Sequence, residues 1–279
     1  MAQNKHLEHL EDELINYGYG GYVASRDLIK NFTKELGGRP TGRVTVTTKW
    51  DGAPAVVCGI DPESGKFFVG TKSVFNKKEP KVNFTEKDID KNHGEIPDLA
   101  KKLKYCLKYF PELKIKGIVQ GDLLFTDEDV VTKNIDKERY YTATPNTLTY
   151  AWPADSDLGK AVHTAKIGAV FHTYYSGTGP INGLNAGFGV SQFNLKSTKN
   201  VFLASATMDN ISANSGLTAA EERTLNTVIA VADRNASVAK PFIEMVAHEA
   251  TKQFTLGYTM KRFTNSYVKE GQKINNVNT

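Results

Sequence analysis

The sequence predicts an α+β protein in which an antiparallel sheet lies between two helical regions. Three observations support this class. Apolar residues recur every three or four positions near both ends of the chain, short β-branched and aromatic runs fill the middle, and a glycine- and asparagine-rich loop at 176–189 separates the two patterns. We expect a helical lead-in over 1–40, a sheet domain over 41–195 and a helical region over 196–279.

The lead-in has the spacing of two consecutive helices. Apolar residues recur at helical intervals through residues 6–36, but the run Tyr17-Gly18-Tyr19-Gly20-Gly21 interrupts them. Glycine lowers helix stability, so a break is predicted within this run.

Strand patterns begin after residue 43. Three short runs, at 44–48, 55–60 and 66–70, are rich in β-branched, aromatic or other apolar residues, and the segment 61–65 has turn composition. An antiparallel sheet is therefore predicted to start here.

The middle region continues with one helix and further strands. Apolar residues line one face of 96–110 and Pro111 follows, which predicts a helix ending before the proline. Strands are predicted at 117–125 and 167–174, and a less regular one at 140–152.

The last region is predicted to be helical over about 218–269. Thr218 and Glu221 have the spacing of a capping box, in which each side chain accepts from the other residue's backbone N–H group. Its apolar positions indicate either an ordinary core or a face that binds a partner.

The composition is that of a globular protein. The 279 residues are 40% hydrophobic and 24% charged, with a formal net charge of +4. No apolar run approaches the ~20 residues that a membrane span needs, and the polar N-terminus differs from a secretory signal. We expect no membrane segment and a cytoplasmic location.

Two features bear on metal and phosphate binding. Cys58 and Cys106 are the only cysteines and lie far apart, which favours two buried thiols over a disulfide or a clustered metal site. Lysines concentrate at 72–91 and 101–116 among aromatic residues, where they could contact a polyanion or form solvated surface.

The segment Lys49-Trp50-Asp51-Gly52 is the strongest candidate for chemistry. It falls between two predicted strands, so the lysine would project from a turn beside the sheet. A lysine amine attacks phosphorus only in its neutral form, and burial or a neighbouring positive charge lowers its pKa. Lys72 could supply such a charge.

With these residues, the sequence resembles the covalent nucleotidyltransferase superfamily of DNA ligases, RNA ligases and mRNA-capping enzymes. The superfamily motif Lys-x-Asp-Gly matches Thr48-Lys49-Trp50-Asp51-Gly52. The resemblance implies that Lys49 is the residue that becomes nucleotidylated and that Thr48, Trp50, Asp51 and Gly52 line the nucleotide.

Later segments follow the motif order of that superfamily. Thr71-Lys72 stands where the family has a Ser-Arg or Thr-Arg pair, with lysine in place of arginine, and Gly121-Asp122 stands where it has Gly-Glu, one methylene shorter. Phe171 occupies the position of the aromatic residue that stacks on the base. Asp122 could instead simply end a strand, and Phe171 could belong to the core.

The resemblance implies an ATP-grasp-like nucleotidyltransferase domain. ATP, with GTP less favoured, would bind with Mg²⁺, and Lys49 would form a lysyl-AMP intermediate. AMP would then pass to a nucleic acid with a 5′-phosphate end. The wording of several segments is also similar to an uncharacterised ligase-like family of tailed bacteriophages, which would place the protein in the cytoplasm of an infected cell.

The sequence departs from the superfamily in its last third. A Glu-Gly strand that places the metal is missing, since Glu270-Gly271 ends a predicted helix. A Lys-x-Lys strand that neutralises phosphate is missing too, because only eight residues follow Gly271. Three explanations stay open: the chain is a piece of a longer protein, another polypeptide supplies the strands, or the fold serves binding.

Two further hypotheses come from other classes. The protein could be a non-catalytic phage module that binds nucleic acid or protein on the same fold. Alternatively, the motif matches arise by chance and the chain is an α+β structural component whose lysines serve solubility.

Overall fold

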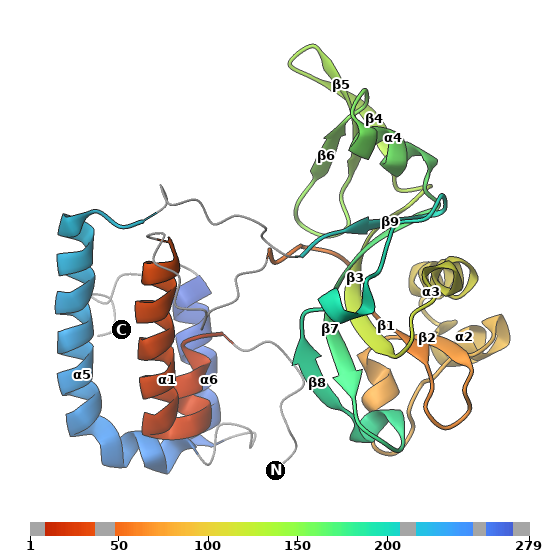
Figure 1. The fold of residues 1–279 in the computed structure, drawn as a ribbon. Helices are drawn as coiled ribbons and strands as arrows, with labels where there is room; N and C mark the ends of the chain where they lie inside the picture. The colour runs from red at the N-terminus through yellow and green to blue at the C-terminus, as the bar shows by residue number, and fades with distance from the viewer. Residues whose placement is uncertain (1–8, 37–47, 207–215, 248–254, 270–279) are drawn as a thin grey trace. The chain divides into compact units, whose positions relative to one another are not determined.

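The computed structural model describes residues 9–36, 48–206, 216–247 and 255–269, and the chain forms two compact units (Figure 1). The sheet unit contains residues 47–208 together with the first five, and the helical unit combines 6–46 with 209–279. The predicted lead-in and tail therefore form one unit, and the sheet unit continues beyond residue 195.

An antiparallel sheet forms the centre of the sheet unit (Figure 1). The strand order is β2-β1-β3-β7-β8, and β9 pairs with β7 in parallel. The strands are β1 Ala55–Ile60, β2 Phe67–Gly70, β3 Ile118–Thr126, β7 Ile167–Ser176, β8 Asn185–Phe188 and β9 Val201–Ala204. The coarse α+β prediction with a mainly antiparallel sheet is confirmed, and β9 lies in the region expected to be helical.

A second, smaller sheet of order β4-β5-β6 stands at one end of the unit (Figure 1). Its strands are Val131–Ile135, Glu138–Ala143 and Tyr150–Pro153, followed by helix α4 at Asp157–Thr164. The less regular strand expected at 140–152 is thus parts of two strands. All of β4 is exposed.

Helices α2 (Glu86–His93) and α3 (Pro97–Tyr109) lie on one side of the main sheet. Proline is favoured in the first turn of a helix, where no N–H partner is lost, and Pro97 begins α3. Leu103 and Cys106 of α3 pack with Val56, Val119 and other sheet residues in the largest apolar cluster. The opposite face carries two separate clusters, one around Leu124 and Trp152 and the other around Phe68 and Tyr175.

Short 3-10 helices occur at Lys72–Phe75, Phe110–Leu113, Ile181–Gly183 and Ser191–Phe193. Thr71 begins the first of them, and its hydroxyl accepts from the backbone N–H of Ser73. The turn therefore starts at the threonine directly after β2.

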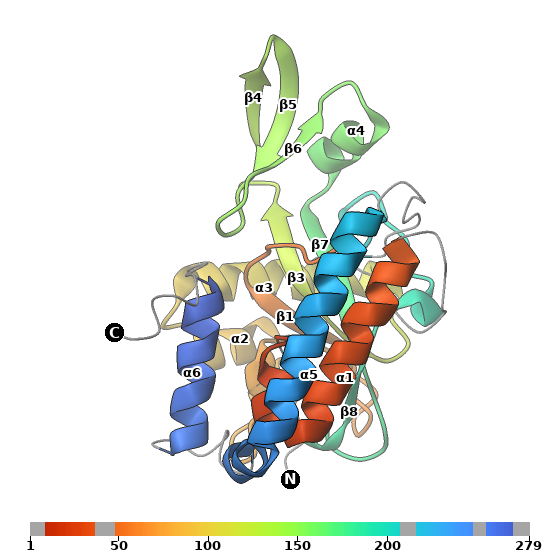
Figure 2. The same cartoon turned by 90° about the vertical axis from the view of Figure 1, so that its left-hand side faces the viewer.

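The helical unit contains α1 (Asp12–Leu36), α5 (Ala219–Ala247) and α6 (Leu256–Lys269), with α1 and α5 side by side (Figure 2). The predicted break in α1 is confirmed, because Gly18 has φ 66° and ψ −147° inside the helix. The predicted cap of α5 is also confirmed. Thr218 donates its backbone N–H to Glu221, whose own N–H donates to the Thr218 hydroxyl.

Three smaller predictions have different outcomes. Cys58 and Cys106 are buried free thiols, as expected, and burial raises the pKa of each. Of the strand predicted at 44–48, only Thr48 is among the described residues, and it lies in no strand. No described helix has the length and apolar character needed to cross a membrane.

Candidate functional site

Hydrogen bonds hold the backbone on both sides of Lys49. The N–H of Thr48 donates to the carbonyl of Ala206 at 2.7 Å, and the indole of Trp50 donates to the carbonyl of Ser205 at 3.0 Å. Both acceptors directly follow β9. The Lys49 side chain is exposed, so its amine is accessible from solvent while its neighbours are hydrogen-bonded.

Asp51 binds the loop that precedes β6. Its carboxylate accepts from the Asn146 amide at 2.8 Å and from the backbone N–H groups of Thr147 and Leu148 at 2.9 and 3.0 Å. Its own N–H donates to the Tyr150 hydroxyl at 2.6 Å. The carboxylate is therefore engaged in positioning this loop.

These contacts lower the pKa of Asp51. The largest cause is the hydrogen bond from Asn146, followed by the two backbone donors, and the positive charge of Lys49 contributes less. Each favours the ionised carboxylate. Asp51 is an anion at neutral pH, close to the Lys49 amine.

Gly52 brings this segment against β3. A Cβ at Gly52 would lie 2.6 Å from the Cβ of Asp122 and 2.6 Å from the carbonyl oxygen of Leu123, so only glycine fits. The N–H of Ala53 donates to the same Leu123 carbonyl at 3.0 Å. Two motifs that are distant in the sequence therefore meet.

Asp122 faces His172 on the next strand. The Asp122 Oδ2 and His172 Nε2 atoms are 3.5 Å apart, and the two side chains are 21% and 23% exposed. His172 Nδ1 lies 2.8 Å from the Thr173 hydroxyl. The pair lies between the two apolar clusters of the face opposite α3, and part of it is open to solvent.

A close strand approach creates this pair. A Cβ at Gly121 would stand 2.0 Å from the Val170 carbonyl oxygen, and the β3–β7 register shifts beside it, because Gln120 pairs with Thr173 while Gly121 pairs with Phe171. His172 is the extra residue of this bulge. Bulges redirect side chains, and here the histidine meets Asp122.

Thr71 and Lys72 lie at the same end of the sheet as Asp122. They directly follow β2, whose last residue Gly70 pairs with Val57 of β1, and β1 in turn pairs with β3.

Phe171 is not on the face that carries Asp122. It is 4% exposed and packs in the cluster beneath α3, where its ring meets Phe110 edge-on at a centroid distance of 5.5 Å. This is the core position that the sequence left open as an alternative. The aromatic rings beside Lys49 are those of Trp50 and Tyr150, 5.0 Å apart.

The sequence did not single out Gln120, Tyr150 or Tyr175 as site residues. The Tyr175 hydroxyl donates to Gln120 Oε1 at 2.6 Å in a buried position beside Asp122, and burial raises the pKa of Tyr175 to about 12. The sequence did contain one signal for this pair: Gln120 interrupts the apolar run of β3, and a buried polar side chain needs a hydrogen-bond partner.

A family model described as a family of unknown function, DUF6267, matches residues 4–279. The chain belongs to this family. Comparisons with curated proteins and with solved structures gave no match. Because the DUF6267 match extends over both units, the sheet unit and the helical unit are parts of one family architecture.

The site of this DUF6267 protein combines an exposed amine, a half-buried carboxylate, a hydroxyl and two aromatic rings. Among the described residues, no group of three His, Cys, Asp or Glu side chains is arranged to hold a metal. Lys49, Thr71 and Lys72 can contact anionic oxygens, and Asp122 can accept from hydroxyl groups. These are contacts that a nucleotide can make.

Proposed function

We propose that the sheet unit is an ATP-grasp-like nucleotidyltransferase domain of the ligase and capping-enzyme type, in which Lys49 receives AMP from ATP. The contact between Gly52 and Asp122 carries this proposal, because it brings the lysine motif beside the candidate ribose-binding carboxylate. Thr71 and Lys72 directly follow β2, at the end of the sheet where Asp122 lies, which also supports the proposal.

In the proposed reaction, the neutral Lys49 amine attacks the α-phosphorus of ATP. A nitrogen–phosphorus bond forms, the bond to the bridging oxygen breaks, and pyrophosphate leaves. The ammonium form must first lose a proton to solvent, because only the neutral amine has a lone pair for the attack. Mg²⁺ would enter with the nucleotide and neutralise phosphate charge.

The remaining side chains would orient the nucleotide. Asp122 accepts from the ribose hydroxyls, while Thr71 and Lys72 contact phosphate oxygens. The base is proposed to lie against Trp50 and Tyr150, because Phe171 packs beneath α3. In the second half-reaction AMP would pass to a nucleic acid with a 5′-phosphate end, and a further polypeptide segment would supply the late phosphate-neutralising motifs.

The test is intact-mass spectrometry of the full chain after incubation with ATP or GTP and Mg²⁺. The expected result is a nucleotide-sized mass gain that disappears in Lys49→Ala and Lys49→Arg. Lys133→Ala is the matched control, since Lys133 is an exposed lysine on β4 of the same unit, and it should keep the gain. A gain that survives Lys49→Arg would refute the role of Lys49.

A second candidate is a non-catalytic module that binds a nucleotide or nucleic acid. The buried position of Phe171 favours it, because the family's stacking residue is then absent from the candidate face. Saturable binding of ATP or of a 5′-phosphorylated oligonucleotide, with no mass gain and with loss of affinity in Lys49→Ala, would select this alternative.

A further inference from the structure

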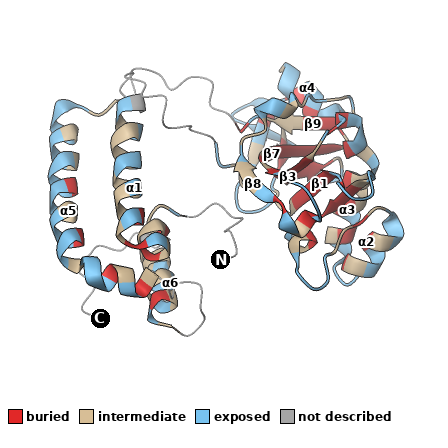
Figure 3. Ribbon diagram, turned by 60° about the horizontal axis from the view of Figure 1, so that its bottom comes forward, coloured by how far each residue is buried: buried red, intermediate tan, exposed pale blue. Residues whose placement is uncertain are grey.

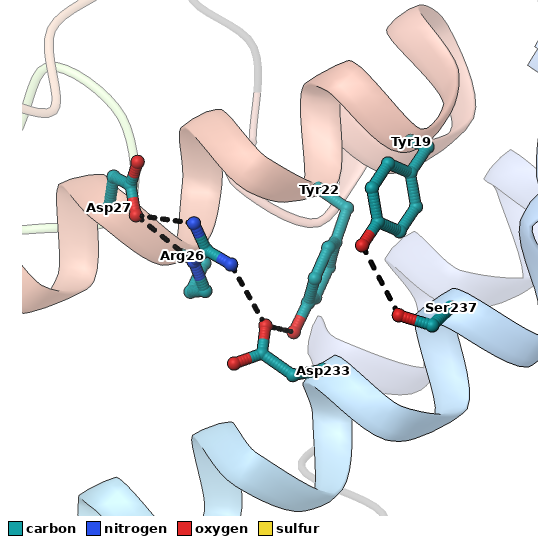
Figure 4. Close-up of polar contacts among 6 residues, drawn as sticks. All are labelled: Tyr19, Tyr22, Arg26, Asp27, Asp233 and Ser237. Atoms are coloured by element: carbon teal, nitrogen blue, oxygen red, sulfur yellow. Dashed lines mark hydrogen bonds and ion pairs between the residues drawn. The ribbon is translucent and has the colours of Figure 1, made fainter.

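Helix α5 has two apolar faces, of which α1 covers one. Ile229, Ala236 and Ile243 recur every seven residues and are buried. On the same side, Asp233 accepts from Tyr22 at 2.8 Å, and Ser237 lies 3.3 Å from the Tyr19 hydroxyl (Figure 4). Side chains of α1 therefore cover this face of α5.

The other face of α5 is apolar and exposed. Figure 3 shows buried residues on only part of the helix surface. On the far side from Asp233, the side chains of Val228, Val231, Val238, Phe242 and Met245 are 59%, 42%, 81%, 43% and 55% exposed, respectively. We call these five residues, together with the exposed Asn235, the α5 seam.

The spacing of the α5 seam is that of a coiled coil. Successive members are three, four, three, four and three residues apart, which are the a and d positions of a heptad. From Val228 to Met245 the seam extends about 26 Å along the helix. A solvent-facing helix surface is usually charged, but beside the seam only Arg234 carries a charge.

The described residues of the helical unit include few large buried apolar side chains. Its large buried apolar side chains are Ile15, Ile229, Ile243 and Val246, whereas Tyr17, Leu28, Phe32, Leu256 and Phe263 are exposed in addition to the α5 seam. Contiguous exposed apolar patches mark interaction surfaces. Among the described residues of the helical unit, the α5 seam is such a patch.

The chemistry of Asn235 identifies the surface that this patch would bind. A primary amide contains both a donor and an acceptor, so two asparagines that face each other satisfy one another inside an apolar seam. A single asparagine at an a position fixes register in paired helices. Among the described residues of the sheet unit, the exposed large apolar side chains form no heptad row: Val131 and Ile135 are both on β4, and the others, such as Leu158 and Phe188, are on separate elements.

We propose that this protein forms a dimer in which the α5 seams of two copies pair in parallel, with Asn235 opposite Asn235 of the partner subunit. Pro241 lies within α5 next to the seam, and proline bends helices. The closest pairing therefore extends from Val228 to Val238. The dimer is independent of the proposed nucleotidyltransferase activity.

The first test is light scattering of the full chain during size-exclusion chromatography. Wild type should elute as a dimer, and Val228→Lys with Val238→Lys should raise the dissociation constant by at least about a hundredfold, because two charges would be buried without partners. Val131→Lys is the matched control, since Val131 is 52% exposed on the sheet unit, and it should remain dimeric. A monomeric wild type would overturn the proposal.

A cross-linking test avoids variants that fail to fold. Asn235→Cys should form an intermolecular disulfide under mild oxidation, because the two introduced thiols would face each other across the seam. The native cysteines are buried and should not compete. Asn226→Cys, the same substitution at an exposed position seven residues before Asp233 and on the side of α5 away from the seam, should cross-link much more slowly. Equal cross-linking rates for the two variants would contradict a seam centred on Asn235.

Discussion

Gly52 lies so close to Asp122 that a Cβ on the glycine would stand 2.6 Å from the Cβ of the aspartate. The two residues belong to separate sequence motifs, and their contact sets the distance between the Lys49 segment and β3. The lack of a side chain at residue 52 thus determines the geometry of the candidate site.

Gly52→Ala should destabilise the sheet unit by about 1–3 kcal/mol, because the new methyl group would overlap Asp122 and the Leu123 carbonyl. Urea unfolding followed by tryptophan fluorescence measures this loss. Gly183→Ala is the control, since a Cβ there meets nothing within 4 Å. Equal stability of the two variants would mean that the close contact does not constrain the site.

The loop bound by Asp51 should open in acid. The pKa of Asp51 is lowered in the folded protein, chiefly by Asn146, so its stabilising effect is complete above the unfolded value of about 4 and is lost as the pH falls through the folded value. Tryptophan fluorescence should report the change, because Trp50 adjoins Asp51. Asp51→Asn removes the titration, and an acid profile identical to that of wild type would contradict the assignment.

Two glycines of α1 should respond in opposite directions to substitution by alanine. Gly18 has φ 66° and ψ −147°, and a Cβ there would stand 2.6 Å from Glu244 Oε2, so Gly18→Ala should cost about 1–3 kcal/mol. Gly20 has open space at its Cβ position, and Gly20→Ala should stabilise the helix by about 0.5–1 kcal/mol. Thermal unfolding followed by circular dichroism measures both changes.

The contact between Tyr22 and Asp233 should weaken at high pH (Figure 4). Burial, and then the hydrogen bond to Asp233, raises the pKa of Tyr22 to about 12. Because the folded pKa exceeds the unfolded value of about 10, the stabilisation is complete below pH 10 and is lost as the pH rises to about 12.

Tyr22→Phe isolates this effect. Asp233 is 37% exposed, so solvent screening limits the expected loss at neutral pH to about 1 kcal/mol or less. Chemical unfolding of wild type and variant at several pH values should give a stability difference that shrinks above pH 10. A difference that stays constant up to pH 12 would refute the raised pKa.

Local chemistry explains which features the sequence predicted well. The kink at Gly18 and the cap formed by Thr218 and Glu221 depend on residues within one helical turn, and each was expected from those residues alone. The strands at 55–60 and 167–176 were likewise marked by their own composition. The part of the candidate site next to Lys49 belongs to this local category.

Non-local packing explains what the sequence did not predict. Strand periodicity alternates side chains between two faces, but it does not say which face α3 covers, so the core position of Phe171 was only one of two alternatives. The bulge at His172 then shifts the alternation along β7. The four-residue β9 has too little pattern of its own, and its parallel partner β7 lies earlier in the chain.

The hydrogen bond between Thr48 and Ala206 joins the two ends of the long 47–208 segment of the sheet unit. A segment with neighbouring ends can be inserted into another protein, or excised from it, without stretching the host chain. The host here is a helix pair whose members, α1 and α5, contact each other directly. The long segment of the sheet unit therefore has the arrangement of a domain inserted between α1 and α5, one that can vary in sequence without displacing the contacts between these two helices.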